Sequence, residues 1–236
     1  SFEYHYTKVR YFLKTCYFLF ILFALLGCEQ EQQVDEIPSP KFIRFLALGD
    51  SYTIGQGVSF EERWPYQLMK KIDSTSFTFT ALNYIAKTGW TSNDLLVAIA
   101  SEMPGQHDIV SLLIGVNNQY QRKPFSQFQA ELNILIDQAK SLAKDEKIFV
   151  VSIPDYGVTP FGQFDAERIA RELDAYNSYT KNVCDSLNIP YINITEISRN
   201  LGDGNNALAN DNLHPSGFQY GLWAEEILPS FLSLLD

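Results

Sequence analysis

The sequence predicts a doubly wound α/β fold: a flavodoxin-like, five-stranded parallel sheet with helices on both faces, formed as one domain by residues 41–236. Short apolar segments alternate with longer amphipathic segments through that whole stretch. The third and fourth apolar segments contain almost no polar residue, which is typical of strands buried on both faces. No two apolar segments are joined by a turn of hairpin length, so a β-meander is excluded.

Five segments fit strands, and a segment that fits a helix follows each of them. The expected strands are 42–48, 77–84, 109–114, 148–153 and 191–194, and the expected helices are 64–72, 92–103, 126–143, 165–187 and 216–235. Helical crossovers between parallel strands are right-handed. In a sheet of strand order 2-1-3-4-5, ligands bind beyond the carboxyl ends of the first and third strands. We therefore expect the chemistry just after Leu48 and just after Ile114.

Composition excludes several classes of protein. The chain has 236 residues, 46% of them apolar, which is enough for one sizeable core and excludes intrinsic disorder as the main state. Acidic residues outnumber basic ones 28 to 18, which disfavours nucleic acid as a partner, because phosphate contacts need clustered Lys and Arg. Three scattered histidines and the absence of any CxxC predict that there is no metal site.

Residues 1–27 have the order of a secretory signal peptide. Three basic residues precede the uncharged apolar run 17–26, which is too short to span a bilayer comfortably. The run ends in LLGC, which resembles a bacterial lipobox and implies that Cys28 carries lipid after cleavage. Residues 28–40 then form the lipidated cysteine and an acidic tether, and we expect a lipid-anchored protein of the bacterial cell envelope, at the outer membrane or cell surface. The alternative is an uncleaved signal anchor.

Reactive side chains follow the predicted strands. Ser51 follows the first strand in the tripeptide GDS, Gly89 follows the second and Asn117 the third, while Asp211 and His214 lie near the C-terminus. Serine becomes a nucleophile when a base removes its proton, and a carboxylate three residues from a histidine would share one helical face with it and fix its tautomer. Two backbone N–H groups, of Ser51 and Gly89, and the Asn117 amide suit a developing oxyanion.

In order and local context, Ser51, Gly89, Asn117 and His214 match the four blocks of the SGNH (GDSL) hydrolase family, and the match covers essentially the whole body of the chain. The resemblance implies that Ser51 is the nucleophile, His214 the general base and acid, and Asp211 its orienting partner. It also implies that Ser51, Gly89 and Asn117 donate to the oxyanion.

Other residues near these blocks have two interpretations. Asn118 stands where the family's third block commonly has Asp, and since the Asn117 amide is retained we expect activity to survive. With Tyr52 and Trp90, Asn118 is a candidate for the wall of an acyl or sugar pocket, although the aromatic rings could equally pack the core. His107 precedes a strand and is expected on the surface. Cys184 is expected to be a small buried hydrophobe.

The sequence therefore predicts a serine esterase or acyl hydrolase that cleaves carboxylic esters or thioesters through an acyl-enzyme and needs no cofactor. Small-molecule, lipid or glycan esters are the expected substrates. The stretches GDSYTIGQGV and RWPYQL resemble the lysophospholipase and thioesterase-like branch of the family. Two alternatives remain: an O-acetylesterase acting on polysaccharide or peptidoglycan, and a non-catalytic surface lipoprotein that binds a glycan or acyl ligand. Intact Ser, His and Asp positions disfavour the second.

Overall fold

The computed structural model describes residues 41–72, 77–204 and 206–235. The predicted signal peptide, the Cys28 lipidation site and the acidic tether lie outside the described residues. Within the described ranges, no helix combines the length and the apolar character that a membrane span requires.

The body is a parallel sheet of five strands in the order β2-β1-β3-β4-β5, as the sequence predicts. The strands are β1 (Lys41–Gly49), β2 (Phe77–Ala86), β3 (Ile109–Leu113), β4 (Ile148–Val151) and β5 (Tyr191–Ile192), and every neighbouring pair is parallel. The order reverses between β1 and β3, so the carboxyl ends of these two strands are where a doubly wound fold places its ligands.

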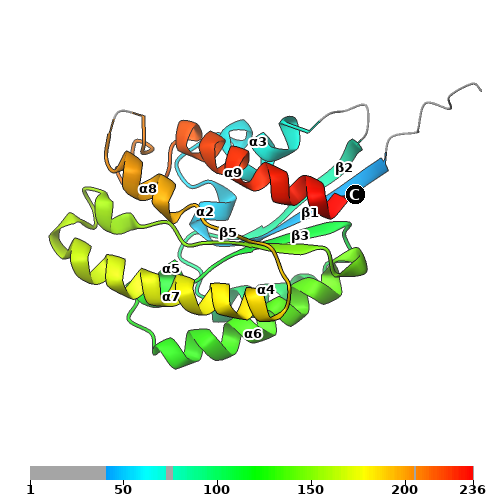
Figure 1. Ribbon diagram of the computed structural model, residues 1–236, viewed down its shortest axis with the longest axis horizontal. Helices are drawn as coiled ribbons and strands as arrows, with labels where there is room; N and C mark the ends of the chain where they lie inside the picture. The colour runs from blue at the N-terminus through cyan, green and yellow to red at the C-terminus, as the bar shows by residue number, and fades with distance from the viewer. Residues whose placement is uncertain (1–40, 73–76, 205, 236) are drawn as a thin grey trace, which may run out of the picture. The chain divides into compact units, whose positions relative to one another are not determined.

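Helices cover both faces of the sheet (Figure 1). One layer holds α4 (Ser92–Glu102), α6 (Phe125–Leu142) and α7 (Ala166–Ser186), and the other holds α3 (Trp64–Lys70), α8 (Thr195–Leu201) and α9 (Gly217–Leu235). The five expected helices are confirmed, with ends that shift by one or two residues. The helix α8 was not expected from the sequence. Short helical segments add to it: α2 (Ser51–Ile54), α5 (Val116–Tyr120) and 3-10 turns at Phe60–Glu62, Lys144–Glu146, Tyr156–Val158 and Gln163–Asp165.

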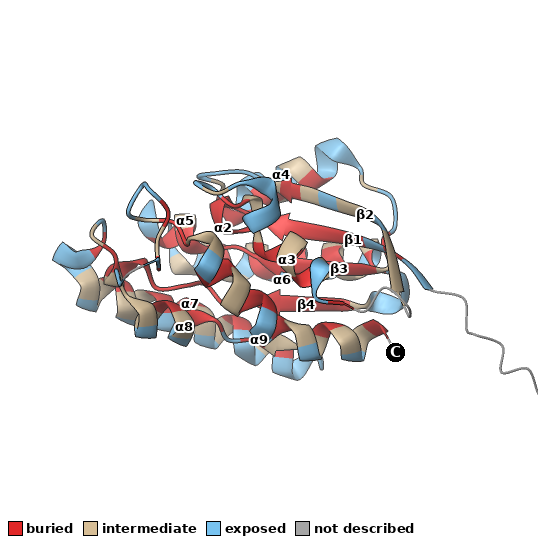
Figure 2. Cartoon of the chain, turned by 90° about the horizontal axis from the view of Figure 1, so that it is seen from above, coloured by how far each residue is buried: buried red, intermediate tan, exposed pale blue. Residues whose placement is uncertain are grey.

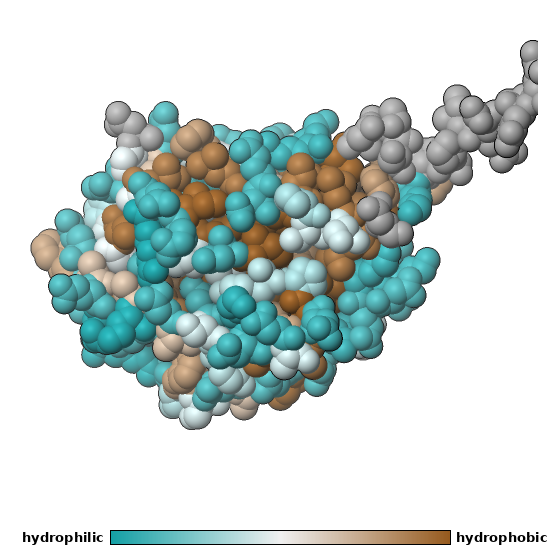
Figure 3. Space-filling model, viewed as in Figure 1, coloured by the Kyte–Doolittle hydropathy of each residue, from teal (hydrophilic) through white to brown (hydrophobic). Residues whose placement is uncertain are grey.

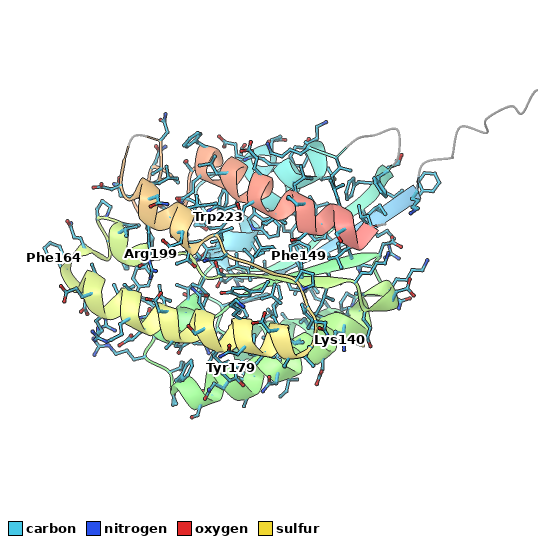
Figure 4. All side chains as sticks on the ribbon, in the orientation of Figure 1. Lys140, Phe149, Phe164, Tyr179, Arg199 and Trp223 are labelled. Atoms are coloured by element: carbon cyan, nitrogen blue, oxygen red, sulfur yellow. The ribbon has the colours of Figure 1, made fainter. Side chains whose placement is uncertain are left out.

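The core lies on both faces of the central strands. Figure 2 shows β1, β3 and β4 buried along most of their length, whereas the edge strand β2 is largely intermediate in burial. Phe45 of β1 is fully buried and its ring centroid lies 5.3 Å from that of Phe231 and 6.1 Å from that of Phe149. Figure 4 labels Phe149 on the sheet and Trp223 on the helix α9 that covers it. Such aromatic pairs add about 0.5–1.5 kcal/mol each beyond their buried area.

Arg199 ties the loop after β4 to two helices. Its guanidinium pairs with Asp155, which is buried, at 2.9 Å, with Asp174 of α7 at 2.7 Å and with Glu196 of α8 at 3.2 Å. Figure 4 shows Arg199 between α8 and α7. The chain leaving β4 is thereby held against α7, which fixes the position of the Tyr156–Val158 turn.

The expectation that His107 is a surface residue is wrong. His107 is 4% exposed, with Nδ1 2.7 Å from the Gly105 carbonyl oxygen and Nε2 3.2 Å from Asn83 Oδ1. Burial lowers the pKa of the ring, so it is held neutral. It is buried because the loop before β3 pairs with the end of α6, at a bridge between His107 and Ala143. Cys184 is a buried free cysteine, as predicted.

Candidate active site

Ser51 is the first residue of α2, at the point where β1 leaves the sheet. Asp50 caps that helix through Oδ1, which accepts the Tyr52 N–H at 3.0 Å. The turn needs glycine at position 49, because a Cβ there would lie 2.2 Å from Thr53 Oγ1 and 2.5 Å from the Leu113 carbonyl oxygen. The close approach of β1, α2 and β3 therefore places the Ser51 hydroxyl at the edge of the sheet.

Asp211 and His214 form a hydrogen-bonded pair. His214 Nδ1 lies 2.7 Å from Asp211 Oδ2, and Asp211 Oδ1 accepts the backbone N–H groups of Leu213 at 3.0 Å and His214 at 2.9 Å. The expected turn of helix is wrong: the segment bends at Asn212, whose φ of 58° is left-handed. The carboxylate instead closes the turn through its hydrogen bonds to the two following N–H groups.

The ring of Tyr52 brings His214 beside the helix that carries Ser51. The Tyr52 and His214 ring centroids are 5.8 Å apart in an edgewise contact, and Trp223 supports the other side of Tyr52 at 6.2 Å. Ionised Asp211 accepts the Nδ1 proton, so Nε2 carries the lone pair that a base needs. Within the part of the chain that the structure describes, the only hydrogen bond of the His214 ring is the one from Nδ1 to Asp211. Among the described residues, neither Ser51 Oγ nor His214 Nε2 forms a hydrogen bond, with each other or with any other group, so both are free to bind a substrate.

The three loops that follow the neighbouring strands β1, β2 and β3 carry hydrogen-bond donors at the carboxyl edge of the sheet. Asn117 lies in the first turn of α5 and donates one amide proton to the Trp90 carbonyl oxygen at 2.9 Å, which leaves its second proton free. Gly89 has φ 84°, and a Cβ there would meet nothing within 4 Å. In the described part of the chain, the N–H groups of Ser51 and Gly89 have no acceptor.

Side chains from neighbouring loops fix these donors. Gln121 donates to the Gly89 carbonyl oxygen at 3.2 Å, and Thr88 donates to Gln56 at 2.7 Å, so the loop after β2 is tied both to α5 and to the segment after α2. Sequence reasoning missed these contacts. A glutamine has no local pattern that reveals its partner in another loop.

Asn118 and Tyr52 are both buried, and Tyr52 lines a small cavity of about 10 Å³. Asn118 is fully buried, its Oδ1 accepts the Ser92 N–H at 2.9 Å and its Nδ2 donates to Ser92 Oγ at 2.7 Å. Ser92 Oγ in turn donates to Glu131. Tyr52 is 3% exposed and packs behind His214. Of the three expected pocket residues, only Trp90 has an intermediate exposure, because the other two side chains point into the domain.

Gly57 is a further residue that the pattern of blocks did not single out. Its φ is 86°, and a Cβ there would lie 2.9 Å from Ala209 Cβ and 3.3 Å from Asp211 Oδ2. Glycine at this position lets the segment after α2 approach the carboxylate that holds His214.

The two carboxyls of the site have opposite pKa shifts. Burial acts to raise the pKa of Asp211, but hydrogen bonds from the His214 backbone, the His214 ring and Leu213 outweigh it and hold the pKa below its usual range. Asp50 is fully buried, Oδ2 has no partner among the described residues, and burial raises its pKa to about 7 against the hydrogen bond from Tyr52. Asp211 is therefore a stable anion and Asp50 a group that titrates near neutrality. No cluster of side chains within the described ranges could hold a metal ion.

A family model shows the family to which the chain belongs. The model of the GDSL-like lipase/acylhydrolase family matches residues 47–221, from the end of β1 into α9. The chain belongs to this family. It is a GDSL-like ester hydrolase, as its sequence motifs predict. A search of curated protein sequences finds no match.

Solved structures resemble the GDSL-like fold of this chain. The crystal structure of TesA matches with a TM-score of 0.62 and 18% identity, over 81% of this chain and 99% of TesA. A variant of Axe2, an acetyl xylan esterase from Geobacillus stearothermophilus, gives 0.62 and 20% over 81% and 95% of the two chains. The psychrotrophic esterase EstA from Pseudoalteromonas sp. gives 0.57 and 20% over 81% and 98%. At these identities the likeness concerns the fold.

Proposed function

We propose that this GDSL-like hydrolase cleaves carboxylic esters and thioesters by a serine mechanism. Ser51 Oγ attacks the carbonyl carbon while His214 Nε2 takes the hydroxyl proton, which gives a tetrahedral oxyanion. The C–O or C–S bond to the leaving group then breaks, and His214 returns the proton to that group. Water, deprotonated by His214, then attacks the acyl carbon of the acyl-enzyme. The bond from this carbon to Ser51 Oγ breaks, and His214 returns the proton to Oγ, which releases the acid and restores the Ser51 hydroxyl.

The N–H groups of Ser51 and Gly89 and the amide of Asn117 would stabilise the oxyanion. The N–H groups of Ser51 and Gly89 come from the backbone, so they need no reorganisation when charge develops, and the Asn117 amide is held by its bond to the Trp90 carbonyl. The Asp211 anion would stabilise the imidazolium form of His214 as it appears. The hydrogen bonds to the Trp90 carbonyl and to Asp211 support the proposal, because they fix the orientations of the Asn117 amide and the His214 ring.

The observation that carries the proposal is the Asp211–His214 hydrogen bond beside the turn of Ser51. The test is hydrolysis of p-nitrophenyl acetate and of longer-chain p-nitrophenyl esters by the full chain, run beside Ser51→Ala and His214→Ala. We expect turnover that both substitutions abolish. Turnover that survives in Ser51→Ala would exclude Ser51 as the nucleophile.

Two candidate substrate classes differ in the length of the acyl group that the enzyme would remove. We propose a lysophospholipase- or thioesterase-like acyl hydrolase, and the alternative is an O-acetylesterase of polysaccharide or peptidoglycan. Two exposed aromatic rings support the second candidate, the O-acetylesterase. Tyr120, three residues after Asn117 on α5, is 55% exposed, and Phe161 is 50% exposed. Their ring centroids lie 5.7 Å apart. An exposed aromatic face suits a sugar ring, and Axe2 is an acetyl xylan esterase. A kcat/KM that rises with acyl length supports the first candidate, and one that is highest for acetate supports the second.

We also propose that lipid on Cys28 anchors the enzyme in the bacterial cell envelope, so that it meets its ester at a membrane. The LLGC sequence after an apolar run supports this. Palmitate labelling of expressing cells tests it. Label should be present in the natural chain and absent in Cys28→Ala, and label that persists in Cys28→Ala would contradict the proposal.

A further inference from the structure

A cleft, here called the second cleft to keep it apart from the serine site, opens on the α7 side of α5. Its volume is about 550 Å³, within the range of roughly 300–1,000 Å³ that is usual for small-molecule sites. Its rim and floor come from the end of α5, the start of α6 and the first half of α7, and they include Gln119, Arg122, Lys123, Phe125, Glu172 and Tyr176.

This cleft is separate from the serine site. Asn117 and Gln119 are two residues apart on α5, so their side chains diverge by roughly 200° around the helix. Asn117 donates to the Trp90 carbonyl, whereas Gln119 donates to Glu172 of α7 at 2.7 Å. The short helix α5 therefore stands between the oxyanion donors and the second cleft.

The rim of the cleft is cationic in an acidic protein. Arg122 and Lys123 are exposed and form no ion pair with any described residue. Arg168 also lines the cleft, but it pairs with Glu172 at 2.7 Å and with Asp165. The residues that line the cleft therefore include three cations, Arg122, Lys123 and Arg168, and one carboxylate, Glu172, while the whole chain carries a net charge of −10. The local excess of positive charge favours an anion.

The floor of the cleft is apolar and rigid. Tyr176 is buried, its ring centroid lies 4.8 Å from that of Phe125, and Ala175 lies beside it. Gln119 is fixed from two sides, because Tyr156 Oη donates to its Oε1 at 2.8 Å while its Nε2 donates to Glu172. Figure 3 shows mostly hydrophilic side chains on the outer face of α7, in contrast to the apolar ones around α9.

We propose that this cleft binds a small organic anion. The carboxylate or phosphate group would lie between Arg122 and Lys123, the two cations without a partner among the described residues, and the apolar body would contact Phe125 and Tyr176. Neither part of the ligand touches Ser51 or the oxyanion donors. The site is therefore a binding site in addition to the catalytic one.

Phenyl phosphate is the probe, because it joins a phosphate to an apolar ring and contains no carboxylic ester. Titration calorimetry of the full chain should give measurable binding by phenyl phosphate and at least tenfold weaker binding by inorganic phosphate and by phenol. In Arg122→Gln/Lys123→Gln the Kd for phenyl phosphate should rise at least tenfold. The control Lys70→Gln/Lys181→Gln removes two exposed charges outside the cleft and should leave the Kd within twofold.

Three results would overturn the proposal. The first is no binding of phenyl phosphate at millimolar concentrations, and the second is equal affinity for phenyl phosphate and inorganic phosphate, because the apolar floor would then contribute nothing. The third is an unchanged Kd in Arg122→Gln/Lys123→Gln whose thermal melt matches that of the natural chain. Since binding is measured directly, these results are independent of whether the serine mechanism holds.

Discussion

Asp211 holds His214 by both oxygens of one carboxylate. Oδ2 accepts the ring Nδ1–H at 2.7 Å and Oδ1 accepts the backbone N–H of the same residue at 2.9 Å. A carboxylate bound at two points cannot rotate away from the ring without losing both bonds. The backbone position, the ring orientation and the tautomer of His214 are therefore set by one side chain, which is three residues earlier in the chain.

Replacement of Asp211 by Asn should lower kcat about 10³- to 10⁴-fold with little change in KM, because an amide nitrogen facing Nδ1 would favour the wrong tautomer of His214. The measurement is steady-state hydrolysis of p-nitrophenyl acetate. Asp203→Asn, which removes an exposed carboxylate from a nearby loop, is the matched control. A kcat for Asp211→Asn within tenfold of the natural enzyme would contradict the role of this pair.

Gly57→Ala should lower kcat through Asp211. The added methyl group would lie 3.3 Å from Asp211 Oδ2 and 2.9 Å from Ala209 Cβ, so the carboxylate must move. The left-handed φ of 86° should also cost about 1–2 kcal/mol of stability. Gly202→Ala is the control, since Gly202 also has a positive φ but a Cβ there meets nothing within 4 Å. If the two variants lose kcat equally, backbone strain and not the contact with Asp211 is responsible.

Asn118→Asp should destabilise the domain by about 1–3 kcal/mol. The amide of Asn118 donates to Ser92 Oγ, which itself donates to Glu131. A carboxylate at position 118 would compete with Glu131 for the one hydroxyl proton and would place a second negative charge in a buried position. Thermal melts of Asn118→Asp, Glu131→Gln and the double variant measure the coupling. Glu131→Gln should restore stability to Asn118→Asp, and strictly additive losses would contradict this explanation.

Asp50→Asn should remove a pH dependence of stability. Burial raises the pKa of Asp50 in the folded state to about 7, above its ordinary value of 3.8, so the folded chain binds the proton more tightly than the unfolded chain. This stability is complete below about pH 4 and is lost as the pH rises through 7. Asn keeps an oxygen that can cap Tyr52 N–H, and the variant should gain Tm relative to the natural chain between pH 5 and 8. Parallel Tm curves for the two proteins would refute the prediction.

Much of the fold could be predicted, because the apolar runs and the helical periods in the sequence extend over many residues. The buried strands at Ile109–Leu113 and Ile148–Val151 are almost continuous apolar runs, and the five expected helices are each long enough to show a period. The helices α2 and α5 could not be predicted, because four or five residues do not complete two turns. The helix α8 was also missed, although with seven residues it is as long as α3. The strand β5 has only two residues, since the chain turns away after Ile192.

The sequence shows the order of the site residues along the chain. It does not show whether each side chain points toward the site or into the domain. Residues placed just after strands lie at the sheet edge by topology, and Ser51, Gly89 and Asn117 do so. Asn118 follows Asn117 directly and points into the domain, because α5 is a helix and turns neighbouring side chains by about 100°. Burial of His107 depends on pairing with α6, which no local pattern predicts.

The most direct test of the serine mechanism is covalent labelling with a fluorophosphonate ester, followed by mass spectrometry of proteolytic peptides. The phosphorus should be found on Ser51, at a stoichiometry of one per chain, and labelling should be slowed at least 10²-fold in both His214→Ala and Asp211→Asn. A label on any other residue, or labelling of Ser51 at the same rate in the His214→Ala variant, would contradict the mechanism.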